Sequence, residues 1–119
     1  MMQVEEIGSA LVLSFGGEIN VEQMERILSF IRFFINNRRF YYVMDLSSVE
    51  HIHYRAIHLL RKGQENLSRY EGEVVLTGMN SYLRDIFRTL GAESYFHICA
   101  SKKEAMDFFG MGNVRGGFV

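Results

Sequence analysis

The side chains best suited to chemistry gather in the stretch "EHIHYRAIH", between Glu50 and His58. His51 and His53 are two positions apart and His58 follows, so three imidazoles could in principle bind a transition metal. His58 comes a full turn later, and no cysteine or carboxylate stands beside these histidines at a diagnostic spacing. We therefore expect no metal site, and the alternative is a polar, partly exposed segment.

A second candidate for chemistry is the pair His97 and Cys99 in "FHICA". Two neighbours on one face of a strand usually lie too far apart to act as base and nucleophile, and no oxyanion donor is evident. Cys99 is expected to be a small core residue. The segment "SFGGEIN" lacks the spacing of phosphate-binding glycine loops. We therefore expect no enzyme and no cofactor.

The composition narrows the class of protein. The chain has 119 residues, 48% of them hydrophobic, and 13 basic against 14 acidic residues give a net charge of −1. Such a balance provides no general attraction for nucleic acid or anionic membranes. A single cysteine, no signal peptide and no apolar run of about 20 residues favour a cytoplasmic protein without membrane insertion.

The elements that must position these residues alternate between strands and helices. Hydrophobic periodicity and turn residues predict strands near 3–7, 10–15, 40–45, 73–78 and 94–100, and helices near 21–36, 54–70, 81–90 and 102–109. The third helix is expected to bury Leu83, Ile86, Phe87 and Leu90, and Ser101 and Glu104 are expected to form a capping box at the start of the fourth. The order β-β-α-β-α-β-α-β-α indicates an α/β fold: one domain over 1–110 with a mixed, mostly parallel sheet and an antiparallel hairpin at its edge. Residues 111–119 form a Gly-rich tail that we expect to be flexible.

Three boundaries bear on function. Gly16 and Gly17 are expected to end the second strand, and Asn20 to cap the first helix. The third strand should end near Asp45, after which a short polar loop leads into the second helix. An Asp at such a strand end accepts hydrogen bonds from loop amides more often than it acts as a catalyst.

Two aromatic residues do not fit the core pattern of the first helix. Met24, Ile27, Leu28, Ile31 and Ile35 form the buried stripe, whereas Phe33 points nearly opposite to it and Phe30 lies well off it. Homodimerisation or a partner protein would cover these rings, and packing under a neighbouring element is the alternative.

The motifs "GEIN" (17–20) and "DLSSVEHIHYRA" (45–56), with the element order, resemble those of the STAS domain. This family joins sulfate transporters with bacterial anti-sigma factor antagonists, and its usual forms are G-E-[LI]-D and D-L-S-x-V-x-x-[IM]-D-S-S-G. The resemblance runs from about residue 4 to 109. In the antagonists, phosphorylation of a serine in D-S-S-G breaks the complex with an anti-sigma factor.

The residues that differ from this motif lie where the antagonists are phosphorylated. By the resemblance, His53 replaces the Asp, Tyr54 the first Ser, Arg55 the phosphoacceptor Ser and Ala56 the Gly, while Asn20 replaces the last Asp of G-E-[LI]-D. Arginine cannot accept phosphate, and its charge at a helix start costs roughly 0.3–1 kcal/mol unless an anion lies close.

The resemblance implies a protein-interaction module that binds an anti-sigma factor or a related regulatory protein and is not phosphorylated at the usual position. Ser47 and Ser48 remain candidates for phosphorylation, although hydrogen bonds to loop amides are the better expectation. A small-anion or nucleotide-binding module, or an accessory subunit of a lipid-transport ABC system, are the alternatives. The candidate site residues are Asn20, Asp45, Ser47, Ser48, His51, His53, Tyr54 and Arg55.

Overall fold

A computed structural model describes residues 2–110, and the predicted tail 111–119 lies outside the described residues. Five strands form one sheet in the order β1-β2-β3-β4-β5. Their bounds are β1 Gln3–Ile7, β2 Ala10–Ile19, β3 Tyr41–Ile52, β4 Glu73–Thr77 and β5 His97–Cys99. β1 pairs antiparallel with β2 and all other pairs are parallel, so the predicted α/β class with a hairpin edge is confirmed.

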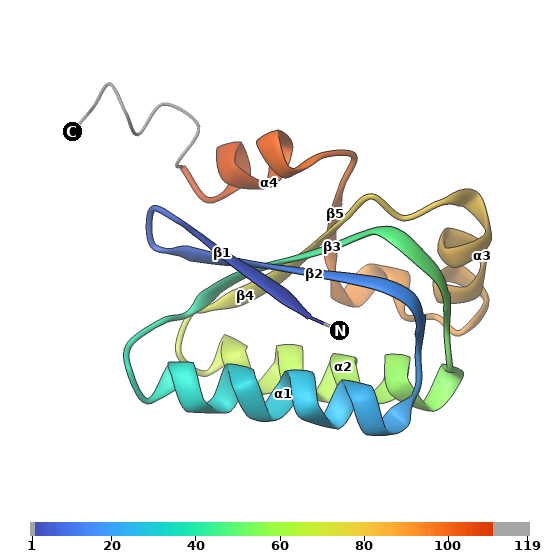
Figure 1. Cartoon of the computed structure of the whole chain (residues 1–119), viewed down its shortest axis with the longest axis horizontal. Coiled ribbons are helices and arrows are strands. Elements are labelled where there is room, and N and C mark those ends of the chain that lie inside the picture. The colour runs from blue at the N-terminus through green and yellow to red at the C-terminus, as the bar shows by residue number, and fades with distance from the viewer. Residues whose placement is uncertain (1, 111–119) are drawn as a thin grey trace.

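Helices cover both faces of the sheet (Figure 1). Their bounds are α1 Val21–Ile35, α2 Tyr54–Ser68, α3 Ser81–Thr89 and α4 Lys102–Phe108, with a 3-10 helix η1 at Glu93–Tyr95. α1 and α2 lie side by side under one face, α4 lies on the opposite face, and α3 sits at one end of the sheet. The larger core fills the α1–α2 side, and a smaller one of mainly Ala, Val and Met side chains lies under α4.

The first helix follows its sequence pattern closely. The five residues of the predicted stripe are all buried. Asn20 caps the helix with a reciprocal pair of hydrogen bonds: its Oδ1 accepts from the Gln23 N–H at 2.8 Å, and Gln23 Oε1 accepts from the Asn20 N–H at 2.9 Å. Such a box satisfies two of the free amides at a helix start and fixes where α1 begins.

Two predicted strand ends are wrong. β2 continues through Gly16 and Gly17 to Ile19, and β3 continues past Asp45 to Ile52, so no polar loop precedes α2. The extensions pair with each other after register shifts between Ser14 and Gly16 and between Gly17 and Glu18. Gly17 has a φ of 72°, which glycine adopts at little cost. The glycines thus bend the paired strands and do not end them.

The second half of the chain needs smaller corrections. The last strand is only three residues long, because residues 94 and 95, which were predicted as strand, belong to η1. Leu83 and Phe87 of the predicted α3 stripe are buried, but Leu90 is 42% exposed because the helix ends there. α4 begins at the predicted Ser101 cap, and the Glu104 carboxylate accepts from the Ala100 N–H, one residue before the expected partner.

Candidate functional site

The site begins where β2 and β3 bend together. Asp45 Oδ1 accepts hydrogen bonds from the Ser47 N–H at 3.1 Å and from the Ser47 hydroxyl at 2.8 Å. Gly78 packs so closely that a Cβ there would lie 2.9 Å from the Ser47 N. Asp45 and Ser47 therefore shape the bend of β3, as expected for an Asp at this place. Ser48 is exposed and pairs across the sheet with Gly16.

His53 forms the start of α2. Its backbone N–H donates to the Ile19 carbonyl at 3.0 Å, and its side-chain Nδ1 accepts from the Arg55 N–H at 3.1 Å. The first bond places the start of α2 next to Asn20, so the two sequence motifs meet at one end of the sheet. The second makes His53 the N-cap, a position where Asp and Asn are strongly preferred for the same acceptor geometry.

Tyr54 and Arg55 stand exposed on the first turn of α2. The Tyr54 ring stacks on the His53 ring with centroids 4.7 Å apart, and the Arg55 guanidinium lies 5.8 Å from the Tyr54 ring centre. Tyr54 is 55% exposed. Among the ion pairs of residues 2–110, none involves Arg55. The cation therefore meets the positive end of the helix dipole without a compensating carboxylate.

His51 connects the end of β3 to α3. Its Nδ1 lies 2.8 Å from the Tyr82 hydroxyl, and the two rings are 5.8 Å apart. Because Tyr82 lies on the first turn of α3, this contact ties α3 to the end of β3, two residues before the His53 cap of α2. His51 and His53 thus each use Nδ1 within the protein, for different partners.

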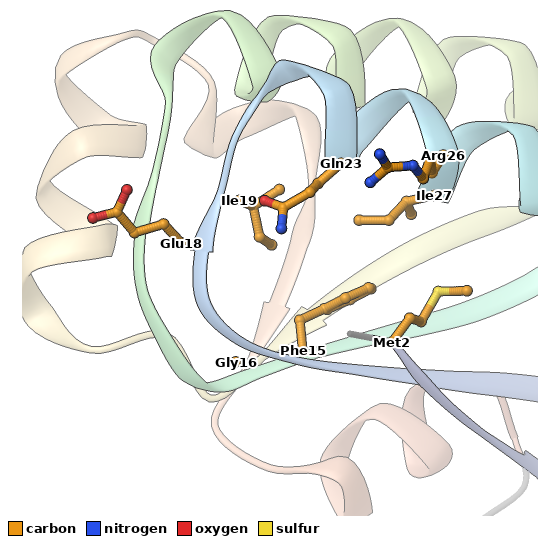
Figure 2. A pocket seen from close by; sticks show the side chains of 8 residues that line it. All are labelled: Met2, Phe15, Gly16, Glu18, Ile19, Gln23, Arg26 and Ile27. Carbon is orange, nitrogen blue, oxygen red and sulfur yellow. The ribbon is translucent and has the colours of Figure 1, made fainter.

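A separate cavity of about 200 Å³ lies on the other side of Asn20, between the sheet and the first turns of α1. Figure 2 shows Phe15 of β2 and Met2, the residue before β1, reaching toward Ile27, with Gln23 and Arg26 nearby. No candidate site residue from the sequence lines this cavity.

A groove between α2 and α3 adjoins the surface that Tyr54 and Arg55 form at the start of α2. Two adjoining cavities, of about 270 and 240 Å³, share Tyr54 and Leu90 in their linings. The first is bordered by Arg55, His58 and Arg61. The Arg61 guanidinium lies 4.3 Å from the Tyr95 ring centre, and its Nε is buried with no hydrogen-bond acceptor among the described residues. The α2 side of the groove is thus basic.

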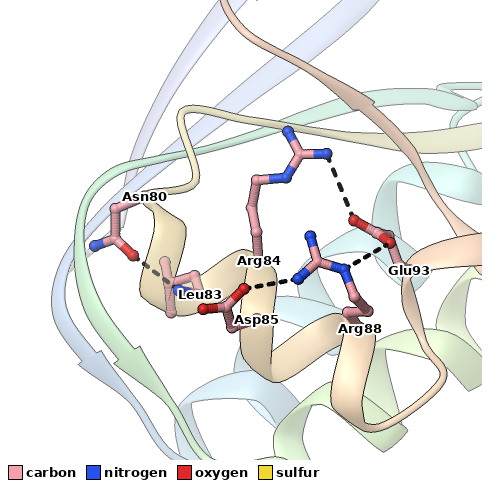
Figure 3. A network of polar contacts seen from close by, with 6 residues as sticks. All are labelled: Asn80, Leu83, Arg84, Asp85, Arg88 and Glu93. Carbon is pink, nitrogen blue, oxygen red and sulfur yellow. Dashed lines mark hydrogen bonds and ion pairs between the residues drawn. The ribbon is translucent and has the colours of Figure 1, made fainter.

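The α3 side of the groove has its charges paired internally (Figure 3). Arg88 Nη1 lies 2.7 Å from Asp85 and its Nε 3.8 Å from Glu93, while Arg84 is 3.5 Å from Glu93. The Asn80 side chain caps this helix by accepting from the Leu83 N–H at 2.8 Å. These pairs hold η1 against α3. The carboxylates of Asp85 and Glu93 are engaged in them and do not neutralise the arginines of α2.

The other candidates for chemistry are placed elsewhere. Cys99 is buried in the smaller core, and burial raises the pKa of its thiol. The His97 ring stacks on Phe108 with centroids 3.7 Å apart. Within residues 2–110, no cluster of three or more His, Cys, Asp or Glu side chains is arranged to hold a metal. None of the described helices is both long and apolar enough to cross a membrane.

The structure therefore gathers most of the predicted site residues at one end of the sheet. His51, His53, Tyr54 and Arg55 form a continuous surface, and Asn20 adjoins it through Ile19. Tyr82, Arg61 and Leu90 also belong to this surface but were not predicted as site residues. The only sequence signal for Tyr82 is its place two residues after Asn80, a residue able to cap a helix.

Comparisons with known proteins place the chain in a family. The STAS domain model matches residues 1–105. A crystal structure described as that of a putative anti-sigma factor antagonist from Thermotoga maritima has a TM-score of 0.82 at 18% identity, covering 90% of this chain and 92% of its own. The phosphorylated form of SpoIIAA, a Bacillus cell fate determinant, has a TM-score of 0.71 at 18% identity, covering 92% and 99%.

A sulfate transporter family protein from Wolinella succinogenes has a TM-score of 0.76 at 14% identity, covering 88% of each chain. These likenesses concern the fold, because all three identities are low. No curated protein sequence matches the chain. The match to the family model spans residues 1–105, a range that includes both motifs, so the chain belongs to the STAS domain family.

Proposed function

We propose that this protein is a protein-interaction module of the partner-switching kind, whose site at the start of α2 is not controlled by phosphate on residue 55. Structural neighbours named as anti-sigma factor antagonists support the class of function. The proposed partner is an anti-sigma factor or a related regulatory protein in the cytoplasm. The role is binding, with no catalytic step.

The observation that carries the proposal is Arg55, exposed on the first turn of α2 directly after the His53 cap. A helix start tolerates phosphate because the helix dipole and free amides stabilise a negative charge. An arginine in this position has no hydroxyl to phosphorylate and already supplies a positive charge. A partner that binds here should therefore present carboxylates or aromatic rings to Arg55, and binding should not depend on dephosphorylation.

The neighbouring surface fits this role. Exposed aromatic rings at Tyr54, Tyr82 and Tyr95 flank the groove between α2 and α3, and aromatic residues with arginine are typical of interface hot spots. Two arginines without a carboxylate partner among the described residues, Arg55 and Arg61, border the same groove. A partner with acidic side chains around an apolar segment would satisfy both features.

The test is affinity capture from the host followed by identification of the bound proteins. We expect an anti-sigma factor or a related regulator to bind the wild type and to be lost with Arg55→Glu. Arg69→Glu, which changes an exposed arginine at the other end of α2, is the matched control and should retain the partner. Capture of transport ATPase subunits in an Arg55-dependent way would instead assign the chain to an ABC system.

Phosphorylation is tested on the same material. Trypsin cleavage after Arg39 and Arg55 releases a peptide that contains Ser47, Ser48 and Tyr54. After incubation with host extract and ATP, we expect this peptide to keep its unmodified mass. If this peptide becomes fully phosphorylated and the captured partner is released, the proposal that phosphate does not control binding at the start of α2 is refuted.

A second candidate function is the binding of a small anion, because Arg55, His58 and Arg61 border one cavity of about 270 Å³. Arg61 Nε is buried there without an acceptor among the described residues, and an anionic ligand could supply one. Thermal-shift measurements with inorganic phosphate and with nucleoside triphosphates test this function. If the protein binds such an anion here, the ligand should raise the melting temperature of the wild type. This rise should disappear in Arg55→Ala and in Arg61→Ala.

A further inference from the structure

The second half of β2 has an open edge. β1 begins at Gln3, which pairs with Ser14, whereas β2 continues to Ile19. Among residues 2–110, the stretch from Gly16 to Ile19 pairs with β3 on one side and with no strand on the other. Unpaired N–H and C=O groups along a strand edge are a template for a further strand. We call the position beside residues 15–18, in line with β1, the open edge.

The register shifts in this part of the sheet do not interrupt β2. Between the pairs Ser14–Asp45 and Gly16–Ser48, β2 has one residue and β3 has two, and Glu50 is the extra residue at the second shift. The extra residues thus bulge out of β3, and β2 presents a continuous, bent edge. Gly16 itself is exposed, and a glycine within a strand often marks the close approach of another backbone.

A cavity lies on each face of the sheet at the open edge. Side chains alternate between the two faces of a strand, so Phe15 points to the main core under α1 and Ser14 to the opposite face. The cavity of about 200 Å³ on the α1 side has Phe15, Ile27 and Met2 as apolar walls (Figure 2). A second cavity, of about 260 Å³, is lined by Gln3, Ser14, Phe15, Gly16 and Ser48. An added strand would direct alternate side chains into the two cavities.

The cavity linings define the side chains that such a strand should carry. On the α1 side, Gln23 Oε1 already accepts from the Asn20 N–H at 2.9 Å. The Arg26 side chain is 69% exposed, and among the ion pairs of residues 2–110 it contacts only Glu22, at 3.6 Å. An exposed pair of this kind contributes little, so a second carboxylate can approach Arg26. The other cavity has hydroxyl and amide groups at its wall and suits a small polar side chain.

We propose that an extended segment of a partner protein adds to the sheet at the open edge, as a further strand beside residues 15–18 of β2. On the α1 side it carries an apolar residue for the cavity and an acidic residue for Arg26, and on the other face serine or threonine. Hydrogen bonds to the β2 backbone supply affinity, and the cavities select the side chains. The occupant must offer alternating N–H and C=O groups, which a lipid surface or a simple anion does not have.

The open edge is separate from the candidate site at the start of α2. The Ile19 carbonyl accepts from the His53 N–H on the β3 side of β2, whereas the open edge lies on the opposite side of β2. Of the candidate residues predicted from the sequence, only Ser48 borders either cavity. The two surfaces can therefore bind different partners, and the loss of one leaves the other intact.

The predicted aromatic residues of α1 also lie outside the open edge. Phe33 is 61% exposed, and Phe30 is half-buried. Both rings contact Phe34, with centroids 4.6 Å apart for Phe30 and 5.0 Å apart for Phe33. Neither Phe30 nor Phe33 borders the two cavities, so Phe33→Asp is a control for peptides that bind exposed aromatic rings without forming a strand.

The first test is selection of random octapeptides, displayed on phage, on the full chain. We expect the selected peptides to share an alternating pattern with an apolar and an acidic residue on one face. A synthetic copy should shift the NMR signals of the amides of residues 15–18 and slow their hydrogen exchange. No enrichment over an unrelated protein, or shifts confined to any other surface, would overturn the proposal.

N-methylation of the selected peptide tests for strand addition. Alternate residues of a strand direct their N–H groups to opposite edges. A methyl group on every second peptide nitrogen should therefore abolish binding, and methyl groups on the nitrogens between them should be tolerated. A scan without this period of two contradicts an added strand.

Variants of the two cavities locate the peptide. A Cβ at Gly16 would lie 3.9 Å from Ser48, an ordinary contact, so Gly16→Val should fold, fill the cavity beside it and lose the peptide. Arg26→Glu should weaken binding by roughly two- to fivefold, the range of an exposed ion pair. Arg32→Glu, at an exposed position of the same helix outside both cavities, and Arg55→Glu should bind as the wild type does. Unchanged affinity in both Gly16→Val and Arg26→Glu, or loss in Phe33→Asp, would overturn the proposal.

A second copy of the chain is another possible occupant, and sedimentation velocity distinguishes it. We expect Gly16→Val to sediment as the wild type does at every concentration. A dimer of the wild type that Gly16→Val dissociates would assign the open edge to a second copy and overturn the proposal of a partner protein.

Discussion

The side-chain Nδ1 of His53 accepts a hydrogen bond from the Arg55 N–H at 3.1 Å. This contact joins two residues at which the sequence was expected to differ from the family motif: the His53 side chain caps the helix, and the backbone N–H of Arg55 donates to it. The helix start is thus capped, while the exposed side chain that follows the cap is a cation. Stability and binding at this junction should therefore respond differently to substitution.

Removing the cap should cost stability. His53→Ala is expected to lower the free energy of unfolding by about 1 kcal/mol, because the Arg55 N–H loses its side-chain acceptor. His53→Asp should restore that loss and add a favourable charge at the helix start, worth roughly 0.3–1 kcal/mol. Urea unfolding measures both. His58→Ala, an exposed change in the same helix, should have almost no effect, and an equal loss there would argue against capping.

Arg55 should show opposite effects on folding and on binding. Arg55→Ala removes a cation from the positive end of α2, so we expect the free energy of unfolding to rise by roughly 0.3–1 kcal/mol at low salt. Arg69→Ala removes a cation from the negative end of the same helix and should lower stability by a similar amount. Thermal unfolding at about 10 mM and about 500 mM salt, conditions that differ strongly in screening, measures both signs. A destabilised Arg55→Ala would mean that its guanidinium already has a favourable partner.

The bend that supports the site depends on Gly78. Its φ is 75°, and a Cβ would lie 2.9 Å from the Ser47 N. Gly78→Ala should therefore combine backbone strain with displacement of Ser47, and lower stability by roughly 1–3 kcal/mol. Gly91 has a φ of 68°, but a methyl group added there would have nothing within 4 Å. Gly91→Ala should cost only about 1 kcal/mol, and equal losses for the two variants would mean that the contact with Ser47 is unimportant.

The fold could be predicted largely because its elements have simple periods. The α1 stripe from Met24 to Ile35 and the caps at Asn20 and Ser101 depend on short-range rules, and the structure confirms them. The end of β3 could not be predicted in this way. Ser47 and Ser48 read as loop residues, yet they lie in a strand because the neighbouring β2 bends with it at Gly16.

Part of the candidate site could also be predicted from short-range sequence patterns. His53 and Arg55 are neighbours in sequence, and the resemblance to the family motif placed them at the start of α2. The contact between His51 and Tyr82 spans 31 residues and depends on where α3 lies, which no local pattern specifies. Leu90 was expected in the core because it continues the α3 period, but the helix ends at that residue and its side chain borders the groove instead.

A buried tyrosine gives the protein a defined response to alkali. Tyr42 is fully buried, its hydroxyl donates to the Arg39 carbonyl at 2.7 Å, and burial raises its pKa to about 12, against a smaller lowering effect of the Arg39 charge. Because the folded-state pKa lies above the usual value of about 10, the stability it contributes is complete below about pH 10. That contribution is lost as the pH rises from about 10 through about 12.

Tyr42→Phe should therefore lower the free energy of unfolding by about 1 kcal/mol at about pH 7, since the Arg39 carbonyl loses its donor. Between about pH 10 and pH 12 the variant should lose less stability than the wild type, so the two urea-unfolding curves converge. Tyr70→Phe changes an exposed tyrosine that stacks on Phe40 and should follow the wild type at every pH. A constant difference between Tyr42→Phe and the wild type from neutral pH to the folded-state pKa would show that ionisation of Tyr42 is not linked to unfolding.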